Sequence, residues 1–132
     1  GLGALRADEA VYAMADFDAD GERLHGNQAY ELRFPPGMLP PADAFWSVSL
    51  YGEDRFFTAN ELGRYAVGDR TPGLRKEPDG TLVIPIGHAR PAEDANWLPA
   101  PSSHFYLILR LYHPSEAFRA GQYTIPAVRR GG

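Results

Sequence analysis

Residues 105–112 read FYLILRLY, a stretch in which only Arg110 interrupts a run of apolar and aromatic side chains. The run is shorter than an average helix of about 11 residues, and its aromatic and β-branched side chains are types that strands favour. A short and nearly continuous apolar run is typical of a strand that other layers cover. We therefore predict a central strand that is covered on both faces.

Twelve prolines and fourteen glycines divide the rest of the chain into short segments. Segments of roughly five to nine residues leave little room for a helix of average length. Within residues 28–34 (QAYELRF) apolar and polar side chains alternate, which indicates a half-buried strand. Pro85 cannot donate to a strand ladder and so indicates an edge or a bulge. The expected strand segments are residues 10–17, 28–34, 45–51, 56–58, 64–67 (an edge strand), 81–86, 105–112 and 123–128.

This spacing predicts an all-β fold of two packed antiparallel sheets, a sandwich of jelly-roll type with about seven or eight strands. Residues 10–130 form this single domain, and residues 1–9 are expected to be an N-terminal remnant or linker that is partly helical. One short helix is predicted at residues 115–120, with Ser115 as its N-cap and Gly121 at its end.

The composition excludes several classes of protein. The net charge is -4 and both signs are interspersed, so no basic stripe is present to bind phosphates and nucleic acid is not an expected partner. No apolar run reaches the roughly 18 residues of a membrane span. Cysteine is absent, which excludes disulfides, thiolate metal sites and a cysteine nucleophile but does not indicate a compartment.

Several motifs together resemble one bacterial family. They are GNQAYELRF, LPPADAFWSVSLY, N-x3-RYAVGDRTPGL, DGTLVIPI, NWLPAPSSHFYLILRLYHP and a closing G-x-Y-x-x-P-A-V, and the match runs over nearly the whole chain, from about residue 10 to residue 129. In this order they are similar to the family called domain of unknown function 1214. The resemblance implies a jelly-roll β-sandwich that forms the C-terminal part of larger proteins, behind a preceding domain in the same or a partner chain. It implies no agreed activity. The family tends to have a large residue where this chain has His113, which leaves the role of that position in doubt.

No catalytic constellation, metal site or cofactor site is expected. The turn DFDADG (residues 16–21) has oxygen ligands at calcium-loop spacing, but Asn27 stands where a bidentate Glu is required and no flanking helices are expected. Ser102 and Ser103 precede a histidine, but no nucleophile elbow is present. The four histidines lack the spacing of a metal-binding motif; they are His25, His88, His104 and His113.

Arg110 is the one charged residue in the most apolar strand. A buried guanidinium must be paired or hydrogen-bonded, because an unpaired buried charge costs several kcal/mol. A structural partner is favoured, either a carboxylate such as Asp43 or Asp69 or the carbonyl groups of a loop. The alternative partner is the carboxylate or phosphate of a ligand. Arg64 and Tyr65 are candidates for the same kind of site.

Residues 94–101 read DANWLPAP and place a large aromatic side chain in a loop. One interpretation is a lid in which Trp97 fills the end of the sandwich, is substantially buried, and has Arg110 nearby on the following strand, while Asn96 bonds the backbone. The other makes Trp97 one wall of an aromatic pocket. The candidate ligand-binding residues are therefore Trp46, Arg64, Tyr65, Asn96, Trp97, Arg110 and Tyr112.

Three hypotheses of function follow. The preferred one is a non-catalytic structural or ligand-binding module of a larger bacterial protein, because no complete catalytic constellation is present. The alternative is an enzyme or enzyme subunit that acts on a small apolar or carbohydrate-like ligand in a cleft lined by aromatic and arginine side chains. The third is a homo-oligomer that associates through an apolar patch at Phe56 and Phe57.

Overall fold

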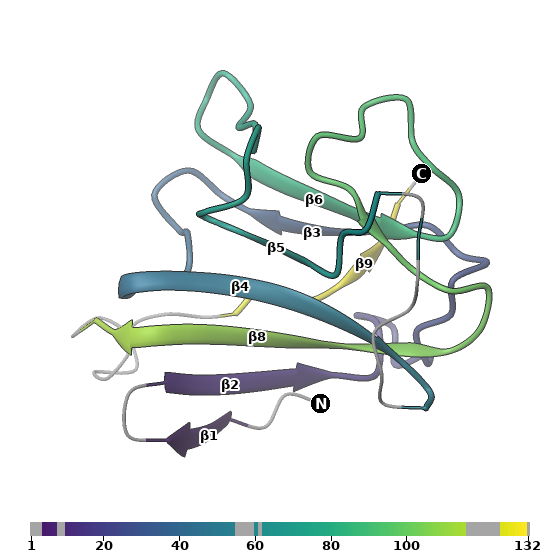
Figure 1. Ribbon diagram of the computed structural model, residues 1–132, viewed down its shortest axis with the longest axis horizontal. Helices are drawn as coiled ribbons and strands as arrows, with labels where there is room; N and C mark the ends of the chain where they lie inside the picture. Colours follow the sequence, from purple (N-terminus) through teal and green to yellow (C-terminus); the bar gives the residue numbers. More distant parts are fainter. Residues whose placement is uncertain (1–3, 8–9, 55–59, 61, 116–124, 132) are drawn as a thin grey trace.

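The computed structural model describes residues 4–7, 10–54, 60, 62–115 and 125–131, which form a β-sandwich of two sheets (Figure 1). The five-stranded sheet has the order β1 (Ala4–Ala7), β2 (Ala10–Ala15), β8 (Phe105–Pro114), β4 (Ala42–Gly52) and β5 (Ala66–Gly68). The four-stranded sheet has the order β7 (Leu98–Pro99), β6 (Leu82–Gly87), β3 (Tyr30–Phe34) and β9 (Arg129–Arg130).

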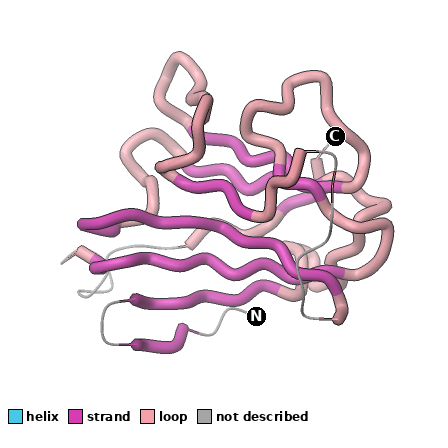
Figure 2. The backbone as a smooth tube through the Cα atoms, in the orientation of Figure 1, coloured by secondary structure: helices cyan, strands magenta, loops and turns pink. Residues whose placement is uncertain are grey.

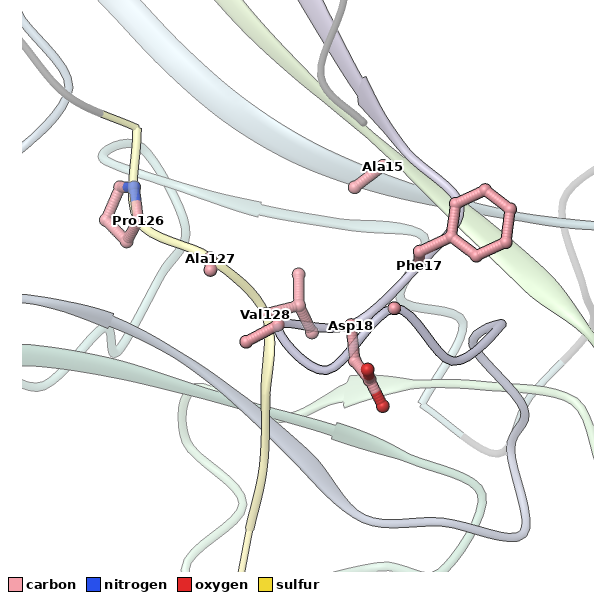
Figure 3. Close-up of a pocket in the computed structure, with 8 residues that line it drawn as sticks. Ala15, Phe17, Asp18, Pro126, Ala127 and Val128 are labelled. Carbon is pink, nitrogen blue, oxygen red and sulfur yellow. The ribbon is translucent and has the colours of Figure 1, made fainter.

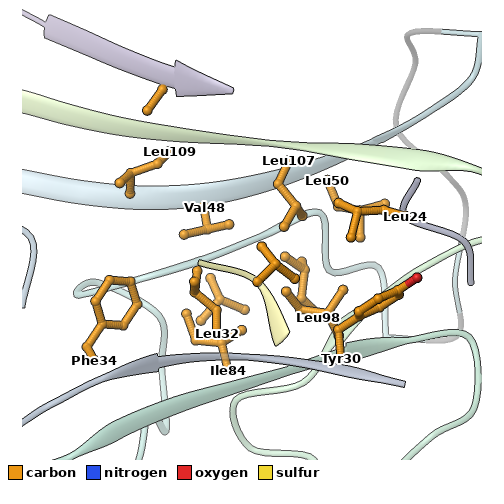
Figure 4. Packing of buried hydrophobic residues seen from close by; sticks show 14 of the residues in the cluster. Leu24, Tyr30, Leu32, Phe34, Val48, Leu50, Ile84, Leu98, Leu107 and Leu109 are labelled. Atoms are coloured by element: carbon orange, nitrogen blue, oxygen red, sulfur yellow. The ribbon is translucent and has the colours of Figure 1, made fainter. Parts of the chain in front are cut away.

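The core lies between the two sheets and follows from the period of two along each strand. On β8, Leu107, Leu109 and Leu111 are buried, whereas Ile108 and Arg110 point to the other face and stay partly exposed. Figure 4 shows side chains of both sheets packed against one another in this layer. Burial of one such leucine stabilises the fold by about 1.5–3 kcal/mol. The alternation in the sequence thus fixes which face of each strand meets the core.

The strand predicted at residues 105–112 is central, as expected, because β8 lies between β2 and β4 and pairs antiparallel with both. Its second face is not fully covered by the described residues, since the outward side chains keep part of their surface exposed. The edge position predicted for residues 64–67 is confirmed by β5, which ends the five-stranded sheet.

The predicted fold class needs correction in four respects. The described residues form nine strands and no helix, so the expected short helix is not supported, and residues 116–120 of that segment lie outside the described part (Figure 2). The sheets are not wholly antiparallel, because β7 runs parallel to β6. The strand orders do not confirm the jelly-roll type. Residues 4–7 form strand β1 rather than part of a partly helical linker.

Other predicted segments shift or fall outside the description. The last strand is β9 at Arg129–Arg130 instead of residues 123–128, because residues 125–128 lie in a loop. Residues 56–58, with the proposed association patch at Phe56 and Phe57, lie outside the described residues. Within the described part no helix has the length and apolarity that crossing a membrane requires.

Pro85 lies inside β6 without loss of a ladder bond. The carbonyl of Val83, two residues earlier, accepts a bond from the Asn96 side chain on the side away from β3. Because backbone groups alternate along a strand, the nitrogen of Pro85 points to that same side. There β7 pairs only with Ile86 and Gly87. The proline thus occupies a stretch of β6 that is locally an edge, as its missing N–H requires.

Candidate functional site

Six of the seven predicted ligand-binding residues lie in three different places. Trp46 belongs to the core, where it is 4% exposed and its ring packs 5.6 Å from that of Phe34. Arg64, Asn96 and Trp97 hold a loop against the four-stranded sheet. Arg110 and Tyr112 lie on the outer face of the five-stranded sheet, on the opposite side of β8 from its core leucines.

Arg64 fastens the loop that precedes β7. Its Nη1 donates to the carbonyl oxygens of Asp94 (3.1 Å), Ala95 (3.1 Å) and Trp97 (3.0 Å). The backbone of Arg64 is held in turn by Asn60, whose side chain accepts from its N–H and donates to its carbonyl. The guanidinium therefore satisfies carbonyl groups at a bend where no strand partner is present.

Asn96 links two separate segments through its side-chain amide. The amide oxygen accepts from the backbone N–H of Arg75 at 2.8 Å, and the amide nitrogen donates to the carbonyls of Arg75 (2.6 Å) and Val83 (3.0 Å). The side-chain amide of Asn96, two residues before β7, thus bonds to backbone N–H and C=O groups in the way that a neighbouring strand would. The prediction that Asn96 fixes the backbone is confirmed.

Trp97 is 3% exposed, which confirms that it is substantially buried. Its indole N–H donates to the carbonyl of Gly87 at 3.0 Å. Leu98 points into the core, so Trp97 points to the outer face of the four-stranded sheet, and it is not a member of the core cluster. The indole therefore lies under residues 88–96, here called the lid loop, and not at the end of the sandwich. Arg90 of that loop lies 5.9 Å from the indole centroid.

Arg110 has neutral partners. Its Nη1 donates to the hydroxyl of Ser49 (3.2 Å), and its Nη2 donates to the hydroxyl of Tyr51 (3.1 Å). Its guanidinium carbon lies 5.5 Å from the ring centroid of Tyr12. Asp69, one predicted carboxylate partner, instead accepts from the backbone N–H of Trp46. The Asp43 side chain is outside the described part. Arg110 also lies on the sheet opposite to the one that Trp97 covers, so the expected proximity of the two is wrong.

Aromatic side chains from three strands surround Arg110 on the same face. Phe45 stacks on Tyr112 with ring centroids 4.2 Å apart, and Tyr51 stacks on Tyr106 at 5.3 Å. These rings stand upright on the sheet, because stacked partners come from the neighbouring strands β4 and β8. We call this set the aromatic ridge. Its members are Tyr12, Phe45, Tyr51, Tyr106 and Tyr112, each of them partly exposed.

Sequence reasoning singled out only Tyr112 of this ridge. The signal for the others was the alternation within residues 45–51 and 105–112, which places Phe45 and Tyr51 on the face opposite Trp46. The remaining candidate, Tyr65, is 37% exposed and lies at the start of β5, where its carbonyl accepts from the N–H of Leu50.

A hollow of about 470 Å³ lies between the end of β2 and residues 126–128 (Figure 3). Asp18 lines it, but its carboxylate is committed to its own turn and to Arg130, at 3.2 Å from Oδ2 to Nε. Burial raises the pKa of Asp18, yet the N–H groups of Glu22 and Asp20 and the Arg130 guanidinium outweigh that effect and hold the pKa below 3.8. Within the described chain no three His, Cys, Asp or Glu side chains converge on a metal position.

Two histidines meet at one end of the sandwich with complementary tautomers. The Nδ1 of His25 accepts from the N–H of Asn27, so its proton is on Nε2. The Nδ1 of His104 faces the carbonyl of Leu24 at 3.1 Å and must donate to it. The rings meet edge to face at 4.7 Å. The Nδ1 atoms of both rings are thus engaged with backbone groups, and the pair contributes packing and hydrogen bonds at this end of the sandwich.

The comparisons with known proteins agree with this fold. The family model described as Protein of unknown function (DUF1214) matches residues 9–116. The crystal structure of the VPA0106 protein from Vibrio parahaemolyticus has a TM-score of 0.81 and 34% identity, and the match covers 94% of this chain and 31% of that chain. An uncharacterized protein from Burkholderia cenocepacia has a TM-score of 0.53 and 18% identity, with 98% and 31% covered.

The second of these structures supports the fold alone, because its sequence identity is low. The chain spans about a third of the length of both solved proteins. No curated protein matches it in sequence. Since the family model covers most of the chain and a solved relative shares a third of its residues, the chain belongs to the DUF1214 family of proteins of unknown function.

Proposed function

We propose that this chain is a non-catalytic β-sandwich module of a larger protein, and that the aromatic ridge is the surface on which another part of that protein packs. The partner is a domain that precedes the module, in the same chain or in a partner chain. In this reading the module supports the assembly of the larger protein. The lid loop and the core serve to keep the sandwich rigid beneath that contact.

The observation that carries the proposal is the composition of the outer face of the five-stranded sheet. A sheet face that meets only water usually alternates with polar side chains. Here the outward positions of β4 and β8 hold two pairs of stacked aromatic rings, with Ser47 and Ser49 on β4 and Ile108 and Arg110 on β8 between the pairs. A sheet face on which partly exposed aromatic rings gather favours an interaction site over a free surface.

The arrangement of the rings favours a polypeptide over a sugar. A sugar stacks on an open aromatic face, because that face carries the negative side of the ring quadrupole. Phe45 has Tyr112 and the Arg70 guanidinium each 4.2 Å from its centroid, and two groups at that distance cannot share one face. Upright rings instead present edges and grooves, into which the side chains of a second layer can interdigitate.

The alternative is an enzyme or enzyme subunit with a cleft lined by aromatic and arginine side chains. Among the described residues, Arg64 and Asn96 are bonded to backbone groups and both tryptophans are buried. Trp97 lines a hollow of about 150 Å³ and Asn96 lines another of about 360 Å³, but the hydrogen bonds of Asn96 and of the Trp97 indole are already made to the backbone of this chain. A ligand-binding role for these residues stays a prediction.

Nitration of tyrosines, mapped by mass spectrometry, tests the proposal. In the isolated chain, Tyr106 and Tyr112 are expected to react, as is the exposed Tyr65, while Tyr30 at 3% exposure serves as the unreactive control. In the larger protein, Tyr106 and Tyr112 should be protected by the packed layer. Equal reaction of these two tyrosines in both forms would remove the proposal.

A further inference from the structure

Arg110 lies in the aromatic ridge, and all of its partners among the described residues are neutral groups. The hydroxyls of Ser49 and Tyr51 each accept one bond, and the ring of Tyr12 lies against the guanidinium. Two of the five guanidinium N–H donors are therefore used, which leaves three. The side chain is oriented by its neighbours, but its charge is not balanced by them.

The neighbouring positions on this face carry no acid. In the cross-strand register, Arg110 pairs with Tyr12 on β2 and Ser47 on β4. The next row of outward positions holds Met14, Ile108 and Ser49. Over the described part of the chain no carboxylate lies within 4.0 Å of the Arg110 guanidinium.

Two arginines that have a carboxylate partner give the contrast, whereas in the described part of the chain Arg64 and Arg70, like Arg110, have no carboxylate within 4.0 Å. Arg130 pairs with Asp18 at 3.2 Å, and Arg90 pairs with Asp94 through its Nε at 2.8 Å. Both have a carboxylate from this chain although they lie at the surface. Arg110, which is more central and enclosed by aromatic rings, has hydroxyl partners only.

We infer that Arg110 is a carboxylate-binding site, and that its occupant is an Asp or Glu side chain in an otherwise apolar segment of the polypeptide that packs on the ridge. The inference rests on the proposed function and adds the chemistry of the partner. A guanidinium that loses its water without gaining an anion costs several kcal/mol. A layer that covers the ridge must therefore supply a negative charge at Arg110, and a carboxylate matches the planar fork of the guanidinium.

A second copy of this chain is a poor occupant. Two copies joined about a twofold axis at the ridge would place the same surface on both sides, with one Arg110 facing the other. Like charges in a desolvated contact oppose association. A free metabolite is also a weaker candidate, because Arg110 lines neither the hollow of about 470 Å³ described above nor any of three further hollows on the described surface. A broad ridge with a central cation fits an acidic polypeptide segment.

The test uses two capped tripeptides, Leu-Glu-Leu and Leu-Gln-Leu, added to the isotope-labelled chain at constant ionic strength. Chemical shifts of the Arg110 side-chain N–H and of the neighbouring tyrosine rings report binding. We expect saturable binding of the glutamate peptide in the millimolar range, at least about tenfold tighter than that of the glutamine peptide, since tenfold corresponds to 1.4 kcal/mol. Equal binding of the two peptides would overturn the inference.

Three variants separate the effect of the positive charge at residue 110, the effect of the planar guanidinium, and the effect of the net charge of the chain. Arg110→Gln should abolish the preference for glutamate, and Arg110→Lys should retain only part of it, because lysine keeps the charge without the fork. Arg129→Gln is the matched control for net charge, since Arg129 is exposed on β9 of the other sheet. Thermal unfolding of each variant verifies that it is folded. A glutamate preference that survives in Arg110→Gln would contradict the site.

Acetate distinguishes the source of the carboxylate. A docking surface requires apolar contact beside the charge, so acetate should bind several-fold more weakly than the glutamate peptide. Equal binding of acetate and the glutamate peptide would indicate a simple anion site, and would overturn the inference that a polypeptide segment occupies it. Because nitration measures coverage of the ridge and these titrations measure charge, protected tyrosines without a glutamate preference would reject this inference while the proposed function stands.

Discussion

The outer faces of the two sheets are finished in opposite ways. On the four-stranded sheet, the lid loop covers Trp97, and only 3% of the surface of this residue is exposed. On the five-stranded sheet, the aromatic ridge keeps its rings partly exposed around Arg110. In Figure 1 the β5–β6 and β6–β7 connections both rise on the side of the four-stranded sheet, away from β1, β2 and β8. The chain itself thus covers the aromatic side chain on the outer face of the four-stranded sheet, whereas the aromatic side chains on the outer face of the five-stranded sheet stay partly exposed.

The polar groups of the two faces show the same difference. Beneath the lid loop, the Nη1 of Arg64, the amide nitrogen of Asn96 and the indole N–H of Trp97 donate to backbone carbonyls of this chain. On the ridge, Arg110 bonds only to hydroxyls and lacks a described carboxylate partner. Groups that are satisfied internally indicate a structural role, whereas a cation without an anion indicates a contact still to be made.

The largest effect is expected at the closed face. Trp97→Ala removes a buried indole and one of the two donors to the carbonyl of Gly87, which keeps its bond from the N–H of Ala100, so the free energy of unfolding should fall by about 3–5 kcal/mol. Urea denaturation measures this loss. Trp97→Phe is the control that keeps most of the apolar area and loses only the hydrogen bond, at about 0.5–1.5 kcal/mol. A loss below about 1 kcal/mol for Trp97→Ala would show that the lid loop does not depend on the indole.

A smaller loss is expected at the amide that ties the lid loop to β6. Asn96→Ala removes three hydrogen bonds to Arg75 and Val83 and should cost about 1–3 kcal/mol. Asn96→Asp keeps the shape but turns a donor into a charged acceptor that faces two carbonyls. It should therefore be at least as destabilising as Asn96→Ala at neutral pH. An Asn96→Asp variant of wild-type stability would contradict the assignment of the amide nitrogen.

These two residues also show what the sequence could predict. The motif at residues 94–101 was enough to expect a buried Trp97 and a backbone-binding Asn96, because a bulky ring and an amide beside prolines have few other uses. The sheet that they cover could not be predicted. That depends on β7, a two-residue parallel strand whose partner β6 is known only from the folded chain.

The aromatic ridge could not be predicted from the sequence for a similar reason. The sequence of residues 105–112 predicts a strand that is covered on both faces. The outward position of Arg110, on the face opposite the core leucines, is recognised only in the structure, where one face of this strand stays partly exposed. The partners of Arg110 are Ser49 and Tyr51, which lie 61 and 59 residues away in the sequence. Which residues of β4 they oppose is set by the register of two strands, and nothing local in either strand specifies that register.

A loss of about 0.5–1.5 kcal/mol is expected on the open face. Tyr112→Ala removes the stack on Phe45, and such cross-strand aromatic pairs contribute about 0.5–1.5 kcal/mol. Urea denaturation of the isolated chain should thus show a loss several-fold smaller than for Trp97→Ala. The double variant with Phe45→Ala isolates the pair energy. If Tyr112→Ala costs as much as Trp97→Ala, the ridge is part of the structural core and the contrast between the faces disappears.

The smallest effect is a pH dependence confined to the closed face. The hydrogen bond from Arg90 holds the pKa of Asp94 in the lid loop below 3.8, against the opposing effect of burial, and the charges of Arg90 and Arg64 add to it. A carboxyl group whose pKa is lower in the folded state stabilises the fold above its unfolded pKa, and this contribution is lost as the pH falls through the folded value. Acidification below about pH 4 should therefore loosen the lid loop.

Hydrogen exchange of the Trp97 indole N–H should accelerate there relative to Asp94→Asn, in which this pH dependence is absent. The Arg110 side-chain N–H signal should show no matching change, because no described carboxylate contacts it. Equal acid sensitivity of the Trp97 and Arg110 signals would indicate that an acid of this chain already pairs with Arg110, and that the two faces are closed alike.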